Sequence, residues 1–309
     1  MNPHQLWLIT QYSFTEIWRN KTFRVTFMVL IPLLIAYQVS FQSDMFNIPV
    51  EYTLVLSSFI PTQNAYMFNL LLVFPLATMG FWVHKQKKYN TLEALLVHPQ
   101  GNDTYSTGFI LGIIIAFMIM GSISLALAGL INLFASPTSF QPLIYLFYLV
   151  TLFLPTIVFV VGITSFLAAR CFKNGTVTTF FMLVYLSVDI LFLSTLYHGL
   201  FDPLGILLPY TFSGFTGMAD LPGFLLHRTT FLLLGIGFIT LAISGLPRIP
   251  NKINGRQRAV CSGILLLFVG LLAGFITYNH HEQVERRHAL YESCLLYTSD
   301  AADERSSVD

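Results

Sequence analysis

Residues 264–275 read ILLLFVGLLAGF, a continuous apolar stretch without a charge, and IIIAFMIM at 113–120 has the same character. A helix that crosses the hydrocarbon core of a membrane, about 30 Å thick, needs about 20 predominantly apolar residues. Strands of a membrane barrel instead alternate between apolar and polar residues over about 10 positions. Both stretches therefore predict membrane-spanning helices and argue against a barrel.

The composition of the whole chain agrees with this prediction. Hydrophobic residues make up 55% of the sequence, charged residues make up 10%, and the mean hydropathy is +0.68. A typical soluble domain carries about 25% charged residues, so this composition is typical of a chain surrounded by a lipid bilayer. The net charge of +1 provides no concentrated basic face, which excludes nucleic acid as an expected partner.

Seven apolar segments are predicted to be transmembrane helices, and the predicted fold class is all-α, a polytopic helical membrane protein. Their predicted bounds are 23–41, 65–83, 108–134, 142–168, 176–197, 229–246 and 259–278.

Lysine and arginine are unequally divided between the two sides of these segments. Twelve fall on one side: Arg19, Lys21, Arg24, Lys85, Lys87, Lys88, Arg170, Lys173, Arg248, Lys252, Arg256 and Arg258. Three fall on the other side: Arg228, Arg286 and Arg287. Short loops rich in these residues stay in the cytosol, so the N-terminus is predicted to be cytosolic and residue 279 onward to lie outside.

Three segments outside the spans have a character of their own. Residues 1–22 combine apolar and polar positions at helical spacing and predict an interfacial amphipathic helix, with Trp7, Tyr12 and Trp18 at the depth of the lipid headgroups. Residues 84–107 form a cytosolic loop. Residues 198–228 are apolar but interrupted by prolines and glycines, which predicts a broken outer segment that does not span.

The cytosolic loop 84–107 carries a basic cluster, a short amphipathic helix near residues 90–97 and a Pro-Gly turn at 99–101. One interpretation is a helix that docks on a soluble partner through Leu92, Leu95 and Leu96, with Glu93 as a charged contact beside them. The other is a positively charged loop whose short helix only caps the bundle, and the residues by themselves favour this second interpretation.

The run Tyr89-Asn-Thr-Leu-Glu-Ala-Leu-Leu-Val-His-Pro, followed by Tyr105 and Gly108, resembles the hallmark loop of type-2 ABC transporter permeases. In that family a charged stretch leads into Gly-Thr-Leu-Glu-Leu-Leu, a proline-containing turn and a lysine that opens the third span. The resemblance covers residues 1 to about 247. The chain departs from the pattern at Asn90, which replaces the usual glycine, at Phe109, near the customary lysine, and in having a seventh span.

The resemblance implies a six-span permease domain at 23–247, followed by a cytosolic loop and a seventh span at 248–278. It further implies an exporter in the cytoplasmic (inner) membrane of a bacterium that couples to a cytosolic ATP-binding-cassette ATPase subunit and to a second permease half, identical or homologous. The implied coupling residues are Tyr89, Thr91, Leu92, Glu93, Leu95, Leu96 and Pro99. The alternative is a membrane anchor or assembly scaffold for an extracytoplasmic domain, without transport.

The run Phe201-Asp-Pro-Leu-Gly, with Arg228 near the next span, also resembles permeases fused to an outer zinc-aminopeptidase-like domain. Residues 279–293 are accordingly expected to begin an outer segment. The final stretch 294–309 contains CLLYTSDAADE, which resembles a translated sequencing adapter. We therefore expect the natural chain to diverge from this sequence after Ser293.

Two polar features remain as candidate sites. His280, His281, Glu282 and His288 cluster after the last span, but Glu285 stands where the His-Glu-x-x-His zinc pattern requires histidine, so no metal site is predicted. Asp189, well inside a predicted span, could line a substrate or ion path or could hydrogen-bond a neighbouring helix.

Some chemistry is not expected from this sequence. Without a Gly-x-x-x-x-Gly-Lys phosphate loop, ATP hydrolysis must come from a partner chain. We expect neither an enzyme nor a cofactor site, because no nucleophile and base can be paired from the residue pattern.

Gly270 and Gly274 are spaced for close packing between helices.

Overall fold

The computed structural model describes residues 3–42, 59–77, 102–135, 140–191, 201–205, 212–213, 217–218, 220–245 and 253–306. This part of the chain is almost entirely helical, which confirms the all-α prediction. The helices are α1 (Pro3–Arg19), α2 (Lys21–Gln42), α4 (Phe59–Ala77), α7 (Asn102–Ala135), α8 (Pro142–Tyr148), α9 (Leu154–Phe166), α10 (Gly175–Leu191), α11 (Leu221–Gly245) and α12 (Ile253–Ser306). Two π-helical turns, η2 (Leu149–Phe153) and η3 (Leu167–Cys171), extend α8 and α9 into one rod over 142–171.

Five of the described helices are long and apolar enough to cross a membrane. The stretches that meet this criterion are Lys21–Ser40, Thr104–Phe134, Pro142–Cys171, Leu221–Ser244 and Val260–Arg287. The shorter apolar helix α10 has 17 residues, and α4 has 19. The ends of two predicted spans, 78–83 and 192–197, lie outside the described residues. These helices fit a multi-pass membrane protein.

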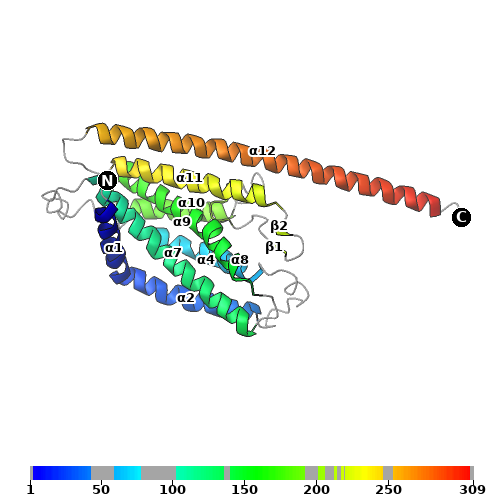
Figure 1. Cartoon of the computed structure of the whole chain (residues 1–309), viewed down its shortest axis with the longest axis horizontal. Helices are drawn as coiled ribbons and strands as arrows, with labels where there is room; N and C mark the ends of the chain where they lie inside the picture. The colour runs from blue at the N-terminus through cyan, green and yellow to red at the C-terminus, as the bar shows by residue number, and fades with distance from the viewer. Residues whose placement is uncertain are drawn as a thin grey trace.

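The long helices lie side by side along the longest axis of the molecule, and α1 runs across the end at which α2 begins (Figure 1). Helix α12 packs along α11 and continues well past the other helices to the C-terminus (Figure 1). It passes without a break through 294–306, the residues with an adapter-like sequence.

The bundle encloses polar side chains within its apolar core and exposes many apolar side chains on its surface. Polar side chains are enclosed: Asn64 accepts a hydrogen bond from Ser124 at 2.7 Å, and Asn132 donates one to Tyr145 at 3.0 Å. Apolar side chains meanwhile point outward along α12, whose candidate span is only 17% buried inside the protein. Soluble monomers rarely expose such a large apolar surface, so this distribution fits a helix in contact with lipid.

Helix α11 is held between two partners by close contacts at glycines. A Cβ placed on Gly235 would lie 2.7 Å from the Cα of Phe159 in α9. On the α12 side, Cβ atoms on Gly270 and Gly237 would lie 2.8 and 2.9 Å from Leu234 and Leu267, respectively. Small residues let helix backbones approach closely in membranes. The packing predicted for Gly270 is thus observed, with α11 as its partner.

The segment before α11 contains a short antiparallel ribbon of β1 (Phe212–Ser213) and β2 (Gly217–Met218), with Phe212 opposite Met218. Helix α11 then begins at Leu221, earlier than the predicted start at 229. Proline is compatible with the first turn of a helix, because the N–H groups there have no partner within the helix, so Pro222 does not stop α11. The predicted broken segment 198–228 therefore ends within α11, and Arg228 is a residue of that helix.

Helix α7 likewise begins before its predicted span. It starts at Asn102, so the last residues of the predicted loop 84–107 are helical. Residues 78–101, which include most of that loop, lie outside the described residues.

Candidate functional site

The predicted site residues divide into those the structure describes and those it does not. Asp189 lies in α10 and is described. The coupling residues Tyr89, Thr91, Leu92, Glu93, Leu95, Leu96 and Pro99 lie outside the described part of the chain. The described residues instead contain a buried polar network around Arg228 that the sequence alone did not predict.

Arg228 is enclosed by the bundle although its side chain is charged. Only 2% of the residue is exposed. Its Nε donates to the carbonyl oxygen of Thr151 at 3.0 Å, and its Nη2 donates to the carbonyl oxygen of Leu152 at 3.0 Å. Nη2 also donates to Oγ1 of Thr156 at 2.6 Å, and Nη1 to the carbonyl oxygen of Pro203 at 3.4 Å. All three guanidinium nitrogens therefore have oxygen partners.

The carbonyl groups that bind Arg228 are available because the rod over 142–171 is irregular at this point. The π-helical turn η2 interrupts the α-helical hydrogen-bond pattern, and Pro155 has no N–H to donate to the carbonyl of Thr151. Unpaired carbonyls are costly in a membrane interior. Arg228 donates to the carbonyl of Thr151 and to that of Leu152, which also accepts the hydroxyl of Thr156 at 2.9 Å.

The turn at residues 201–205 folds onto the same network. Thr156 donates its hydroxyl to the carbonyl oxygen of Pro203 at 3.1 Å, and Asn69 donates its amide to the carbonyl oxygen of Leu204 at 2.7 Å. Oδ1 of Asp202 accepts from the backbone N–H of Gly205 at 2.8 Å, which closes the turn.

Gly205 is required at the end of this turn for two reasons. It has φ of +71°, a left-handed conformation that favours glycine. A Cβ at this position would also lie 2.8 Å from Nη1 of Arg228. The run Phe201-Asp-Pro-Leu-Gly and Arg228, noted together in the sequence, are therefore in direct contact in the fold.

Asp189 is completely buried in α10, and among the described residues none donates a hydrogen bond to either carboxylate oxygen. It lies within electrostatic range of Asp202, which is also completely buried, and of Tyr185 one turn earlier in α10. Asp189 thus places a second acidic side chain near the turn at 201–205. The described helices provide no partner for the helix–helix hydrogen bond that was one interpretation of this residue.

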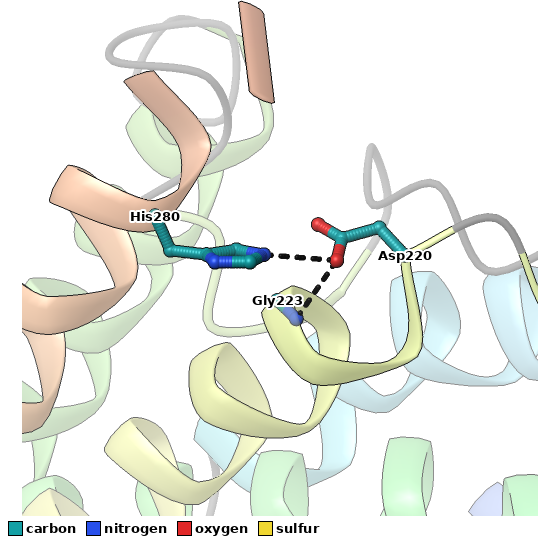
Figure 2. A network of polar contacts seen from close by, with 3 residues as sticks. All are labelled: Asp220, Gly223 and His280. Carbon is teal, nitrogen blue, oxygen red and sulfur yellow. Dashed lines mark hydrogen bonds and ion pairs between the residues drawn. The ribbon is translucent and has the colours of Figure 1, made fainter. Parts of the chain in front are cut away.

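His280 and Asp220 join α12 to the start of α11 (Figure 2). Nε2 of His280 lies 2.9 Å from Oδ1 of Asp220, which also accepts the backbone N–H of Gly223 at 3.1 Å. Deeper in the same helix pair, the hydroxyls of Thr230 and Thr277 are 3.5 Å apart. Among the described residues, His280 is thus paired with a carboxylate from another helix, and no group of three metal-ligating side chains is present.

At the opposite end of the bundle, α1 packs on the first turns of α7. A Cβ on Gly108 would lie 2.7 Å from Cγ2 of Ile9, and one on Gly112 would lie 2.9 Å from the backbone nitrogen of Phe14. Trp7 and Tyr12 face outward, with 62% and 66% of each residue exposed. Helix α1 therefore has one face fixed to α7 and an aromatic face available for lipid headgroups.

No model of a known protein family matches the chain, and a search of curated proteins gives no match either.

Proposed function

We propose that this chain is the membrane-spanning permease subunit of an ATP-binding-cassette exporter. In this proposal α2, α4, α7, the rod over 142–171, α10 and α11 are the six spans of a type-2 permease, and α12 is a seventh. A cytosolic ATPase subunit binds loop 84–107, and a second permease half completes the transporter. The hallmark-like run from Tyr89 to Pro99 supports this assignment.

The single observation that carries the mechanism is the fixed contact between α1 and α7. The hallmark-like loop leads directly into α7, which begins at Asn102. Gly108 and Gly112 hold the next turns of α7 against α1 with no room for an additional methyl group. A displacement of the loop by a docked ATPase would therefore move α1 and the start of α7 as one body.

In this mechanism the Arg228 network is the part of the bundle whose hydrogen bonds differ between the closed and the open state. It ties α11, η2 and the turn at 201–205 together by directional hydrogen bonds. Opening a path at this end requires that these bonds be exchanged for others, so the network favours the closed arrangement. ATP binding shifts the population toward the open state only as far as the docked ATPase binds that state more tightly.

The proposal predicts a specific loss when the coupling face is changed. The double variant Glu93→Arg, Leu96→Ala should lower both ATPase co-purification and substrate-stimulated ATP hydrolysis by at least about tenfold, because interface hot spots cost about 2 kcal/mol or more when truncated. The matched control is Glu285→Arg, the same charge reversal at an exposed site on α12. Unchanged binding and hydrolysis at equal membrane abundance would remove the main support for the exporter.

The proposed orientation places the N-terminus in the cytosol of a bacterial cell and residue 279 onward outside. The position of Arg228 inside the bundle strengthens it, because the outer side then keeps fewer positively charged loop residues. Cysteines introduced at Gln86 and Gln283 test it with an impermeant maleimide. We expect labelling of Gln86→Cys from the cytosolic side only, whereas its labelling in intact cells would invert the topology.

A second candidate function is favoured by the length of α12. Beyond His280, which contacts Asp220 at the start of α11, α12 continues without a break through 281–293 before the adapter-like residues begin, as an anchor for an extracytoplasmic domain would (Figure 1). The coupling variants distinguish the two functions, because an anchor without transport would be insensitive to Glu93 and Leu96.

A further inference from the structure

We propose that Asp220 and His280 form a proton-dependent clasp that holds α12 against the start of α11. Asp220 is the residue before α11 and His280 lies in α12, so the pair joins the two helices where α11 begins (Figure 2). This inference does not depend on transport, on an ATPase or on the sidedness of the membrane.

The carboxylate of Asp220 has two partners of different kinds. Oδ1 accepts the N–H of Gly223, which is the capping bond of α11, and it also faces Nε2 of His280 at 2.9 Å. A capping bond requires only an acceptor oxygen, which asparagine provides about as well as aspartate. The contact with His280 is different, because it becomes an ion pair only when the imidazole is protonated.

The surroundings of His280 and Asp220 allow the strength of their contact to depend on pH. The side chains of His280 and Asp220 are 30% and 18% exposed, so neither is fully enclosed by protein. Histidine is the side chain that ordinarily changes charge between about pH 5 and pH 8. The clasp therefore gains a charge–charge attraction when the imidazole is protonated and keeps at most a neutral hydrogen bond when the imidazole is neutral.

Other charged groups nearby are engaged elsewhere or lie on the same helix as His280. Glu282 pairs with Arg286 of α12 at 2.8 Å, and His281 is the next residue of α12. From α11, the buried ring of His227 packs on Phe231 with 5.0 Å between ring centroids. Among the described residues, Asp220 is the acidic group that contacts His280 from the helix packed along α12.

Gly223 shows how closely the clasp is fitted. A Cβ at this position would lie 3.0 Å from Cδ2 of the His280 ring and would collide with the Asp220 carboxylate. The first turn of α11 therefore leaves space for the imidazole next to the capping bond. Arg228 lies eight residues after Asp220, about two helical turns away, so the clasp fixes the end of the helix that carries the buried network.

The test is a pH titration of the separation between α11 and α12 in lipid nanodiscs. Nitroxide labels are placed at Leu221 and Gln283 of the full chain, with Cys171, Cys261 and Cys294 replaced by serine. Spin–spin broadening measures the fraction of molecules in which the two labels are close. Unlike disulfide cross-linking, this measurement involves no free thiol whose own protonation would change with pH. From about pH 5.5 to about pH 8 we expect the ratio of close to separated forms to fall about two- to fivefold, as for a partly exposed ion pair.

Three variants decide the outcome. His280→Gln should abolish the pH dependence, and Asp220→Asn should abolish it while keeping the helix cap. His281→Gln, the matched control, should titrate like the unmodified chain. A flat titration in the unmodified chain, or an unchanged titration in His280→Gln, overturns the proposal.

Discussion

The two ends of the bundle are held together by different forces. Where α1 crosses α7, the contact depends on shape, with Gly108 and Gly112 admitting neighbouring atoms that a side chain would exclude. Around Arg228 it depends on hydrogen bonds among α11, η2 and the turn at 201–205. A close-packed contact transmits displacement, whereas a hydrogen-bonded network can exchange its partners and so hold or release a closed state.

The largest loss of stability is expected when the charged side chain at the centre of the network, Arg228, is replaced. Arg228→Leu leaves the carbonyl of Thr151 without its Arg228 donor and leaves the single hydroxyl of Thr156 to serve the carbonyls of both Leu152 and Pro203, and each unsatisfied buried group costs about 1–3 kcal/mol. We expect the free energy of unfolding in an SDS titration to fall by about 3 kcal/mol or more. Arg286→Leu, at an exposed arginine of α12, is the control. Equal effects of both substitutions would contradict the structural role of the network.

The contact between α1 and α7 should respond next most strongly, through added volume. Gly112→Ala places a methyl group 2.8 Å from Cβ of Ser13 and 2.9 Å from the backbone of Phe14, so overpacking should cost about 1–3 kcal/mol. Gly274→Ala is the matched control, because the nearest atom to its Cβ, Cγ2 of Thr230, lies at 3.4 Å.

The comparison of these two alanine variants can be made by thermal unfolding in nanodiscs. We expect Gly274→Ala to be neutral or stabilising, since alanine is the better helix former. If Gly112→Ala unfolds at the same temperature as the unmodified chain, the contact between α1 and α7 does not depend on the absence of a side chain at Gly112.

We expect a smaller loss of stability when only the hydroxyl of Thr156 is removed from the network. Thr156→Val removes its bonds to Arg228 and to Pro203 while keeping the shape of the side chain, so we expect a loss of about 1–2 kcal/mol. Thr164→Val removes only a hydroxyl bonded to the carbonyl of Val160 on its own helix and should cost less. Both are measured by SDS titration, and a larger loss at Thr164 would argue against a connection through Thr156.

Asp189 should show the smallest effect on stability. Because the described residues donate no hydrogen bond to its carboxylate, Asp189→Asn should change the free energy of unfolding by less than about 0.5 kcal/mol. If the residue lines a substrate or ion path, the same variant should lower substrate-stimulated ATP hydrolysis in proteoliposomes. A loss of stability above about 1 kcal/mol would instead indicate a hydrogen bond to a neighbouring helix.

The helices were predictable from the sequence to a useful degree, and the errors have a common cause. The predicted spans 23–41, 108–134 and 142–168 correspond closely to α2, α7 and the rod over 142–171. For α11 the predicted start was too late. The prolines and glycines of 198–228 predict an interrupted segment, but Pro222 is compatible with a first helical turn, and His227 and Arg228 are buried by tertiary contacts.

The candidate site was predictable only in fragments. The sequence drew attention to Arg228, to Phe201-Asp-Pro-Leu-Gly and to Asp189 separately, and it placed no weight on Asn69 or Thr156. Neither of these uncharged residues carries a local signal, because asparagine and threonine occur in many membrane helices as packing or hydrogen-bonding residues. The unusual feature that could have indicated the site is Pro155 inside an apolar run, since it leaves a carbonyl unpaired.

The membrane-length helices follow from the amino-acid sequence alone, because the free energy of placing a segment in lipid is largely a sum over its own side chains. The buried position of Arg228 depends instead on tertiary contacts, because its partners come from η2, Thr156 and the turn at 201–205, far apart in sequence. Hydrogen bonds depend on distance and direction between atoms, which no local pattern of residues specifies.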